Sequence, residues 1–90
     1  MSNIKITQEM INRMMERAET KVTTVFGKCT VVAMQFENGF VLVGSSACVD
    51  PANYDVKLGT KIAKQEIEEK LWMLEGYALQ KAVHKLTKCE

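Results

Sequence analysis

The apolar residues near the start of the chain recur with the spacing of an amphipathic helix. From roughly Thr7 to Lys21, and on to Val22, they follow the i, i+3, i+4, i+7 pattern, which places side chains on one helix face. These positions are Ile11, Met14, Met15, Ala18 and Val22. Threonine is a good helix N-cap, so we predict that Thr7 begins the helix and that the apolar face packs on the core.

The polar face of this predicted helix carries two arginines four residues apart, Arg13 and Arg17, with Glu9 one turn before Arg13. An acidic residue four positions before a basic one forms a favourable helical ion pair. The face can therefore be a solvated surface with weak ion pairs. Alternatively, two guanidinium groups on one face can bind an anion such as phosphate.

A β-hairpin is predicted next, because two apolar segments flank a strong turn signal. Cys29–Phe36 and Phe40–Val43 are rich in β-branched and apolar residues. Glu37, Asn38 and Gly39 lie between them, and Asn-Gly favours a tight hairpin turn because both residues tolerate positive φ. A further short strand is expected over Thr23–Phe26.

The predicted register follows from a two-residue loop at Asn38-Gly39. Glu37 then pairs with Phe40, Phe36 with Val41 and Met34 with Val43. One face of the hairpin would hold Met34, Phe36, Val41 and Val43, and the other Cys29, Val31, Ala33, Phe40 and Leu42. Because both faces are apolar, we expect helices to cover one of them and a partner subunit to cover the other.

The second half of the chain predicts one long helix. Asp50-Pro51 suits a helix start, with aspartate as N-cap and proline in the first position, and Asp55 can cap a second start. The apolar positions that follow fit a 3.6-residue period; they are Leu58, Ile62, Leu71, Leu74, Ala78 and Ala82. Extended to Leu86, the helix is about 45 Å long at 1.5 Å per residue. A domain of this size cannot cover it, so we expect a second copy of the chain to bury part of it.

Two glycines lie inside this helix, although glycine there costs about 1 kcal/mol relative to alanine. Gly59 and Ala63 together form a small-residue face on which another backbone can pack closely. Gly76, between Trp72 and Tyr77, can do the same or can leave room for a ligand. Helix packing is the interpretation we favour for both glycines.

Composition and charge narrow the classes of function. The 90 residues predict a single α+β domain, 1–90, and the net charge of +1 argues against a general nucleic-acid binder. No apolar run reaches the ~18 residues of a membrane span. Three cysteines without Cys-x-x-Cys spacing indicate reduced thiols in the cytoplasm, and His84 alone cannot form a metal site. With no nucleophile–base pair, we expect no enzyme and no cofactor.

Four sequence blocks in order resemble a family of small phage proteins. They are NGF at Asn38–Phe40, G-x-S-A-C-V-D-P-A-N-Y at Gly44–Tyr54, LG-x-x-IA at Leu58–Ala63 and W-x-L-E-G-Y-x-L at Trp72–Leu79. The similarity spans roughly Val31 to Leu79, over half of the chain. That family includes the anti-Thoeris sponge proteins of the first described type.

The resemblance implies a function in immune evasion. Such proteins are homo-oligomers, dimers or assemblies of dimers, in the cytoplasm of the infected bacterium. They bind cyclic ADP-ribose isomers made by TIR-domain defence enzymes and hold them intact, and some members also bind cyclic oligonucleotides. For the sponge function we expect neither membrane binding nor DNA binding. The alternative is a phage accessory protein that inhibits a host factor by protein or nucleic-acid contact.

The ligand chemistry suggests candidate site residues. A cyclic ADP-ribose isomer presents an adenine, hydroxyl groups and two phosphates, which call for aromatic, amide and cationic groups. The resemblance implies Asn53 as the amide. The further candidates are Tyr54, Phe36 and Phe40 as aromatic neighbours, Arg13 and Arg17 for the phosphates, and Lys28 and Lys61 as weaker cations.

Overall fold

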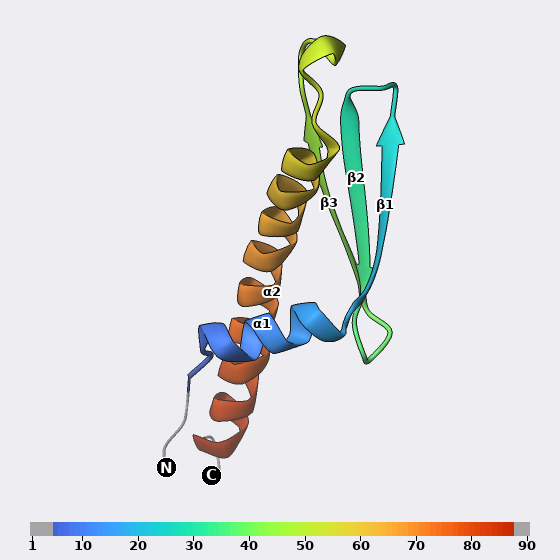
Figure 1. Ribbon diagram of the computed structural model, residues 1–90. Coiled ribbons are helices and arrows are strands. Elements are labelled where there is room, and N and C mark those ends of the chain that lie inside the picture. Colours follow the sequence, from blue (N-terminus) through green and yellow to red (C-terminus); the bar gives the residue numbers. More distant parts are fainter. Residues whose placement is uncertain (1–4, 88–90) are drawn as a thin grey trace.

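The computed structural model describes residues 5–87 and shows an elongated α+β domain, 61 Å in its longest dimension (Figure 1). Its elements in chain order are α1 (Gln8–Arg17), β1 (Glu19–Val25), β2 (Cys29–Gln35), β3 (Val41–Ala47), the short 3₁₀ helix η1 (Pro51–Asn53) and α2 (Val56–Thr87). The predicted order of a helix, a small antiparallel sheet and a long helix is confirmed.

The three strands form an antiparallel sheet in the order β1-β2-β3. Helix α2 runs along one face of the sheet, where it packs on β3 and, less extensively, on β2. Strand β1 lies at the edge farthest from α2 (Figure 1). Helix α1 crosses α2 near the hairpin end of the sheet, and α2 continues past that crossing.

Helix α1 ends earlier than the sequence pattern predicts. Thr7 is the N-cap, as expected, and its hydroxyl accepts a hydrogen bond from the Met10 N–H at 3.2 Å. The helix stops at Arg17, however, and residues from Glu19 onward join the sheet. This segment is rich in β-branched residues, and its pairing with β2 outweighs the helical period.

The predicted hairpin register was wrong by one residue. Phe36 lies opposite Phe40, where its N–H donates to the Phe40 carbonyl at 2.9 Å, and Met34 pairs with Leu42. The loop therefore has three residues and ends at Gly39, whose φ of +91° only glycine adopts readily. A slip of one residue moves each side chain of a strand to the other face, so Val41 and Val43 lie on the face away from α2.

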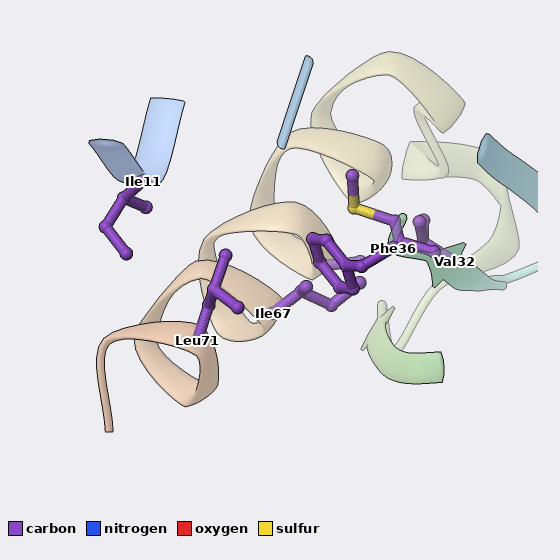
Figure 2. Packing of buried hydrophobic residues seen from close by; sticks show 7 residues of the cluster. Ile11, Val32, Phe36, Ile67 and Leu71 are labelled. Atoms are coloured by element: carbon purple, nitrogen blue, oxygen red, sulfur yellow. The ribbon is translucent and has the colours of Figure 1, made fainter. Parts of the chain in front are cut away.

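The core lies between the sheet, α2 and the crossing helix α1. Figure 2 shows Ile11 of α1 near Leu71 of α2, and Phe36 reaching from the end of β2 toward Ile67. The buried apolar residues are Ile11, Val32, Met34, Phe36, Ala63, Ile67 and Leu71. Trp72 is half-buried and packs against this cluster.

Two glycines let α2 approach the sheet closely. A Cβ atom at Gly44 of β3 would overlap the carbonyl oxygen of Ala63, and one at Gly59 of α2 would overlap the Thr30 hydroxyl. The small-residue face at Gly59 and Ala63 thus packs closely, but the favoured prediction of helix packing was wrong there. Ala63 lies against the backbone of β3 at Gly44, and Gly59 lies against the Thr30 side chain of β2. Around Gly76, by contrast, there is open space.

One face of the sheet has no helix on it. Val41 and Val43 are about half exposed there, at 50% and 46%. Beyond the sheet, α2 exposes further large apolar side chains, including Met73 and Tyr77. Burial of these surfaces by a second copy stays a prediction. None of the helices within residues 5–87 contains an apolar stretch of the length that a membrane span requires.

The close approach predicts opposite effects for two glycine substitutions. Gly44→Ala should lower the free energy of unfolding by about 1–3 kcal/mol, the usual cost of overpacking a core. Gly76→Ala, in an open helical position, should raise it by up to about 1 kcal/mol. Urea denaturation of both variants at one protein concentration measures these changes. Equal stability of Gly44→Ala and the parent would contradict the packing described.

Candidate functional site

The predicted site residue Asn53 lies in a well-fixed turn at one end of the sheet. The Asp50 carboxylate accepts a hydrogen bond from the Ala52 N–H at 3.0 Å, and the Asp50 carbonyl accepts one from the Asn53 N–H at 3.0 Å. Asn53 itself is exposed. Its backbone is thus held in place while its amide side chain remains accessible.

Tyr54 anchors this turn to the sheet. Its hydroxyl hydrogen-bonds with Thr24 Oγ1 of β1 at 2.9 Å and with Thr30 Oγ1 of β2 at 2.6 Å. Thr30 is completely buried, so this pairing satisfies a hydroxyl group that has no access to water. The hydroxyl of Tyr54 therefore has a structural role, whereas its ring borders a cavity.

This cavity, of about 130 Å³, lies between the turn and the start of α2. Its lining combines polar and apolar side chains: Ser46, Ala47, Cys48, Asn53, Tyr54, Asp55, Leu58, Gly59 and Ile62. Sequence reasoning did not identify Cys48 or Ile62 as site residues. The only signal was that Cys48 lies within the Gly44–Tyr54 block and Ile62 within the Leu58–Ala63 block. The turn back onto α2 brings these two blocks together.

A second group of predicted residues lies at the opposite end of the sheet. Phe36 and Phe40 face each other at the β2–β3 hairpin and, with Asn38, line a cavity of about 190 Å³. Met14 of α1 and three residues of α2, Leu71, Leu74 and Glu75, complete that lining. An apolar wall with an amide and a carboxylate beside it is suited to binding a planar group.

The two arginines point along the exposed side of α1, where each has a carboxylate partner. Arg13 Nη2 lies 3.2 Å from Glu9 Oε2, as predicted, and Arg17 Nη1 lies 3.7 Å from Glu37 Oε1. Their side chains are 56% and 59% exposed, and such surface ion pairs are weak. An anionic ligand can therefore replace the glutamates at little cost.

The two predicted lysines lie in different places. Lys28 belongs to the β1–β2 turn, at the same end as Asn53, and its carbonyl accepts a hydrogen bond from the Cys48 N–H at 2.9 Å. Lys61 lies on α2 in an open groove of about 570 Å³ beside α1. Lys57 and Lys64 line the same groove, together with Glu16 and Glu68 of opposite charge.

Except for Lys61, which lies in the separate groove beside α1, the predicted site residues form two groups at opposite ends of the sheet (Figure 1). The turn group comprises Asn53, Tyr54 and Lys28, and the hairpin group comprises Phe36, Phe40, Arg13 and Arg17. Each strand has seven residues and is therefore about 20 Å long. One compact nucleotide cannot touch both groups of the same chain.

The chain is therefore a small α+β protein with helices on one face of its sheet and with candidate binding groups at both ends. Residues 3–83 match the model of the phage protein (N4 Gp49/phage Sf6 gene 66) family, and the chain belongs to that family. The comparisons with curated proteins and with solved structures gave no significant match. Cys29 and Cys48 are free thiols, and residues 5–87 contain no metal-binding cluster; Cys89 lies outside the described residues.

The anchoring of the turn by Tyr54 can be tested by removing one oxygen atom. Tyr54→Phe should lower the free energy of unfolding by about 1–3 kcal/mol, because the buried Thr30 hydroxyl loses its partner. The matched control is Tyr77→Phe, at an exposed position of α2, which should change stability by less than about 0.5 kcal/mol. Chemical denaturation measures both, and a similar effect of the two substitutions would contradict the anchoring role.

Proposed function

We propose that this phage protein is an anti-defence sponge in the cytoplasm of the infected bacterium. It binds cyclic nucleotide immune signals, namely cyclic ADP-ribose isomers from TIR-domain enzymes, without cleaving them. Membership of a phage protein family supports this proposal, as does the resemblance of the blocks between Asn38 and Leu79 to sponge proteins. Cyclic oligonucleotides are further ligands that the resemblance suggests.

The observation that carries the proposal is the fixed turn at Asn53. A sponge without a chemical step needs high affinity, and affinity benefits from groups that are already held in their binding positions. The Asp50 cap and the two hydroxyl bonds of Tyr54 hold the turn, and they leave the Asn53 amide exposed beside a cavity. An asparagine amide offers both donors and an acceptor to a base or ribose edge.

The hairpin group supplies the complementary chemistry. Phe36 and Phe40 provide an aromatic wall for an adenine ring, and Arg13 and Arg17 provide donors for the two phosphates. Because this group lies at the far end of the sheet from Asn53, we propose that the site forms between two copies of the chain. A homo-oligomer is thus part of the proposed function.

The alternative is inhibition of a host factor by direct contact. Several large apolar side chains are strongly exposed, among them Phe26, Val49 and Tyr77, and protein interfaces use such residues. Nucleic-acid contact is less favoured, because the net charge is only +1. Recovery of a stoichiometric host protein from infected cells, with no uptake of cyclic ADP-ribose, would favour this alternative.

A release experiment tests the sponge function directly. The purified protein is mixed with a TIR-derived cyclic ADP-ribose signal, and the mixture is filtered to separate free ligand from bound. The retained protein is then denatured by heat and the released molecule is assayed for activation of the defence effector. Depletion followed by intact release supports sequestration. A cleaved product indicates an enzyme, and absence of depletion contradicts the proposal.

Substitution of Asn53 should separate binding from folding. Asn53→Ala should leave the circular dichroism spectrum unchanged but weaken binding of cyclic ADP-ribose at least ~10-fold, the effect of losing a hydrogen bond of ~1.5–3 kcal/mol. Gln80→Ala, which removes an exposed amide from α2, is the matched control and should bind like the parent. Isothermal titration calorimetry measures all three proteins, and equal affinities would place the pocket elsewhere.

The arginines should contribute mainly through charge. Arg13→Ala combined with Arg17→Ala should weaken binding of the same ligand beyond the Asn53→Ala effect. The loss should be larger at low ionic strength, because salt screens exposed charges. Calorimetric titrations at two salt concentrations test this, with Lys81→Ala combined with Lys85→Ala on α2 as the control for the loss of two positive charges. A double arginine variant that behaves like the control would exclude these arginines from the site.

A further inference from the structure

The two edges of the sheet differ in how their backbone groups are satisfied. At the β3 edge, side chains of α2 bind two of the outward backbone groups. Glu66 Oε1 accepts a hydrogen bond from the Ser45 N–H at 2.8 Å, and Lys70 Nζ donates one to the Val43 carbonyl at 2.9 Å. Side chains that occupy an edge in this way prevent another strand from pairing with it.

The β1 edge has no such protection. Alternate residues of β1 use their backbone N–H and carbonyl groups to pair with β2. The corresponding groups of the residues between them, Thr20, Val22 and Thr24, point outward. Among residues 5–87, none hydrogen-bonds with these outward groups. No helix packs along β1, and Val22 is 45% exposed.

The open edge is also a favourable pairing sequence. Residues 19–25 read ETKVTTV, and five of the seven are β-branched. The strand contains no proline and no bulge, and its seven residues pair without interruption with β2. An exposed, regular edge of this kind readily pairs with another strand unless something blocks it.

We infer that β1 pairs antiparallel with β1 of a second copy and joins the two sheets into one sheet of six strands. The strand is self-complementary about Val22. When Val22 lies opposite the partner's Val22, Thr20 lies opposite the partner's Thr24 and Thr24 lies opposite the partner's Thr20. In each of these three residue pairs the outward N–H and carbonyl groups of both strands can hydrogen-bond with each other. This register also overlaps the two strands over their full length, Glu19 to Val25.

Neighbouring registers are less favourable. A shift that places Lys21 directly opposite the partner's Lys21 opposes like charges, which destabilises a strand pair. A shift in the other direction places Thr23 opposite the partner's Thr23 and shortens the overlap. The full-length register avoids both, because Lys21 then lies opposite the partner's Thr23.

The same register brings the two separated groups of site residues together. Tyr54 contacts Thr24 of β1, and in the pair the partner's Thr20 lies opposite Thr24. Three residues before that threonine, α1 ends at Arg17. Side chains of Thr20 and Thr24 point to the helix-covered face, so the end of the partner's α1 lies on the same side of the sheet as Tyr54.

The pairing also places an exposed aromatic residue near the partner. Phe26 of the β1–β2 turn is 89% exposed and has a positive φ of 56°, a conformation that is unfavourable for a large side chain. In the full-length register Val25 lies opposite the partner's Glu19, so the partner's Ala18, the C-cap of α1, lies at the same end of the strand pair as this turn. The pairing itself depends only on the strand geometry, whereas its role in ligand binding rests on the proposed function.

The introduction of opposite charges at Val22 tests the pairing. The parent protein should have roughly twice the 10.1 kDa monomer mass, or a multiple of it, in light scattering. Val22→Lys and Val22→Glu should each raise the dissociation constant of the pair at least ~5-fold, because only this residue faces its own copy. An equimolar mixture of the two variants should restore pairing, since lysine then faces glutamate.

The control is Val41→Lys, at a similarly exposed valine of β3, which should leave the β1-paired dimer intact. A monomeric parent overturns the pairing, whatever else binds the edge. So does a dimer that persists in both Val22 variants, or one that only Val41→Lys dissociates. Circular dichroism confirms that the variants are folded.

Titration with cyclic ADP-ribose separates this inference from the proposed function. If β1 pairing completes the site, Val22→Lys should bind at least ~10-fold more weakly than the parent, and the lysine–glutamate mixture should recover. A parent that pairs but binds no ligand leaves the pairing intact and overturns the function. If Val22→Lys is monomeric and still binds the ligand like the parent, the inference that β1 pairing completes the site is wrong.

Discussion

The structure depends on the close contact between helix α2 and strand β3. Gly44 and Ala63 allow the helix backbone to approach the strand, and Gly59 does the same at the buried hydroxyl of Thr30. At this distance side chains of α2 reach the edge of the sheet, so Glu66 and Lys70 can bind the backbone of β3. A larger residue at either glycine would separate the two elements and would also remove the protection of the strand edge.

The position of α2 explains which surfaces of the domain remain open. A helix that lies over β3 and β2 cannot also cover β1, and it leaves the opposite face of the sheet exposed. The C-terminal half of α2 extends past the crossing with α1, where few residues of the same chain can pack against it (Figure 1). A domain this small buries a limited apolar area by itself, so assembly is a natural source of further stability.

The arrangement of the proposed site follows from the antiparallel sheet. Successive turns of a meander alternate between the two ends of the strands, so the β1–β2 turn and η1 share one end and the β2–β3 hairpin occupies the other. Residues that are close in sequence, such as Phe40 and Asn53, therefore lie far apart. A ligand that needs an amide, an aromatic wall and two cations must then be bound at one end or between copies.

Much of the fold could be predicted because its signals are local. Thr7, Asp50 and Asp55 cap helices through contacts within three residues, and Asn38-Gly39 marks a hairpin by its own backbone preferences. The candidate residues could be chosen in the same way, from residue types and ordered blocks. Local sequence patterns therefore predict the kind and the order of the elements.

How these elements meet depends on long-range contacts that only the folded structure shows. It ended α1 at Arg17, because pairing with β2 is a long-range interaction that the helical period does not contain. It selected the three-residue hairpin loop, since the packing of Phe36, Met34 and Leu42 beneath the helices settles a register that Asn-Gly alone leaves open. It also divided the candidate site between two ends of the sheet, because the separation of residues in space depends on chain topology and not on residue type.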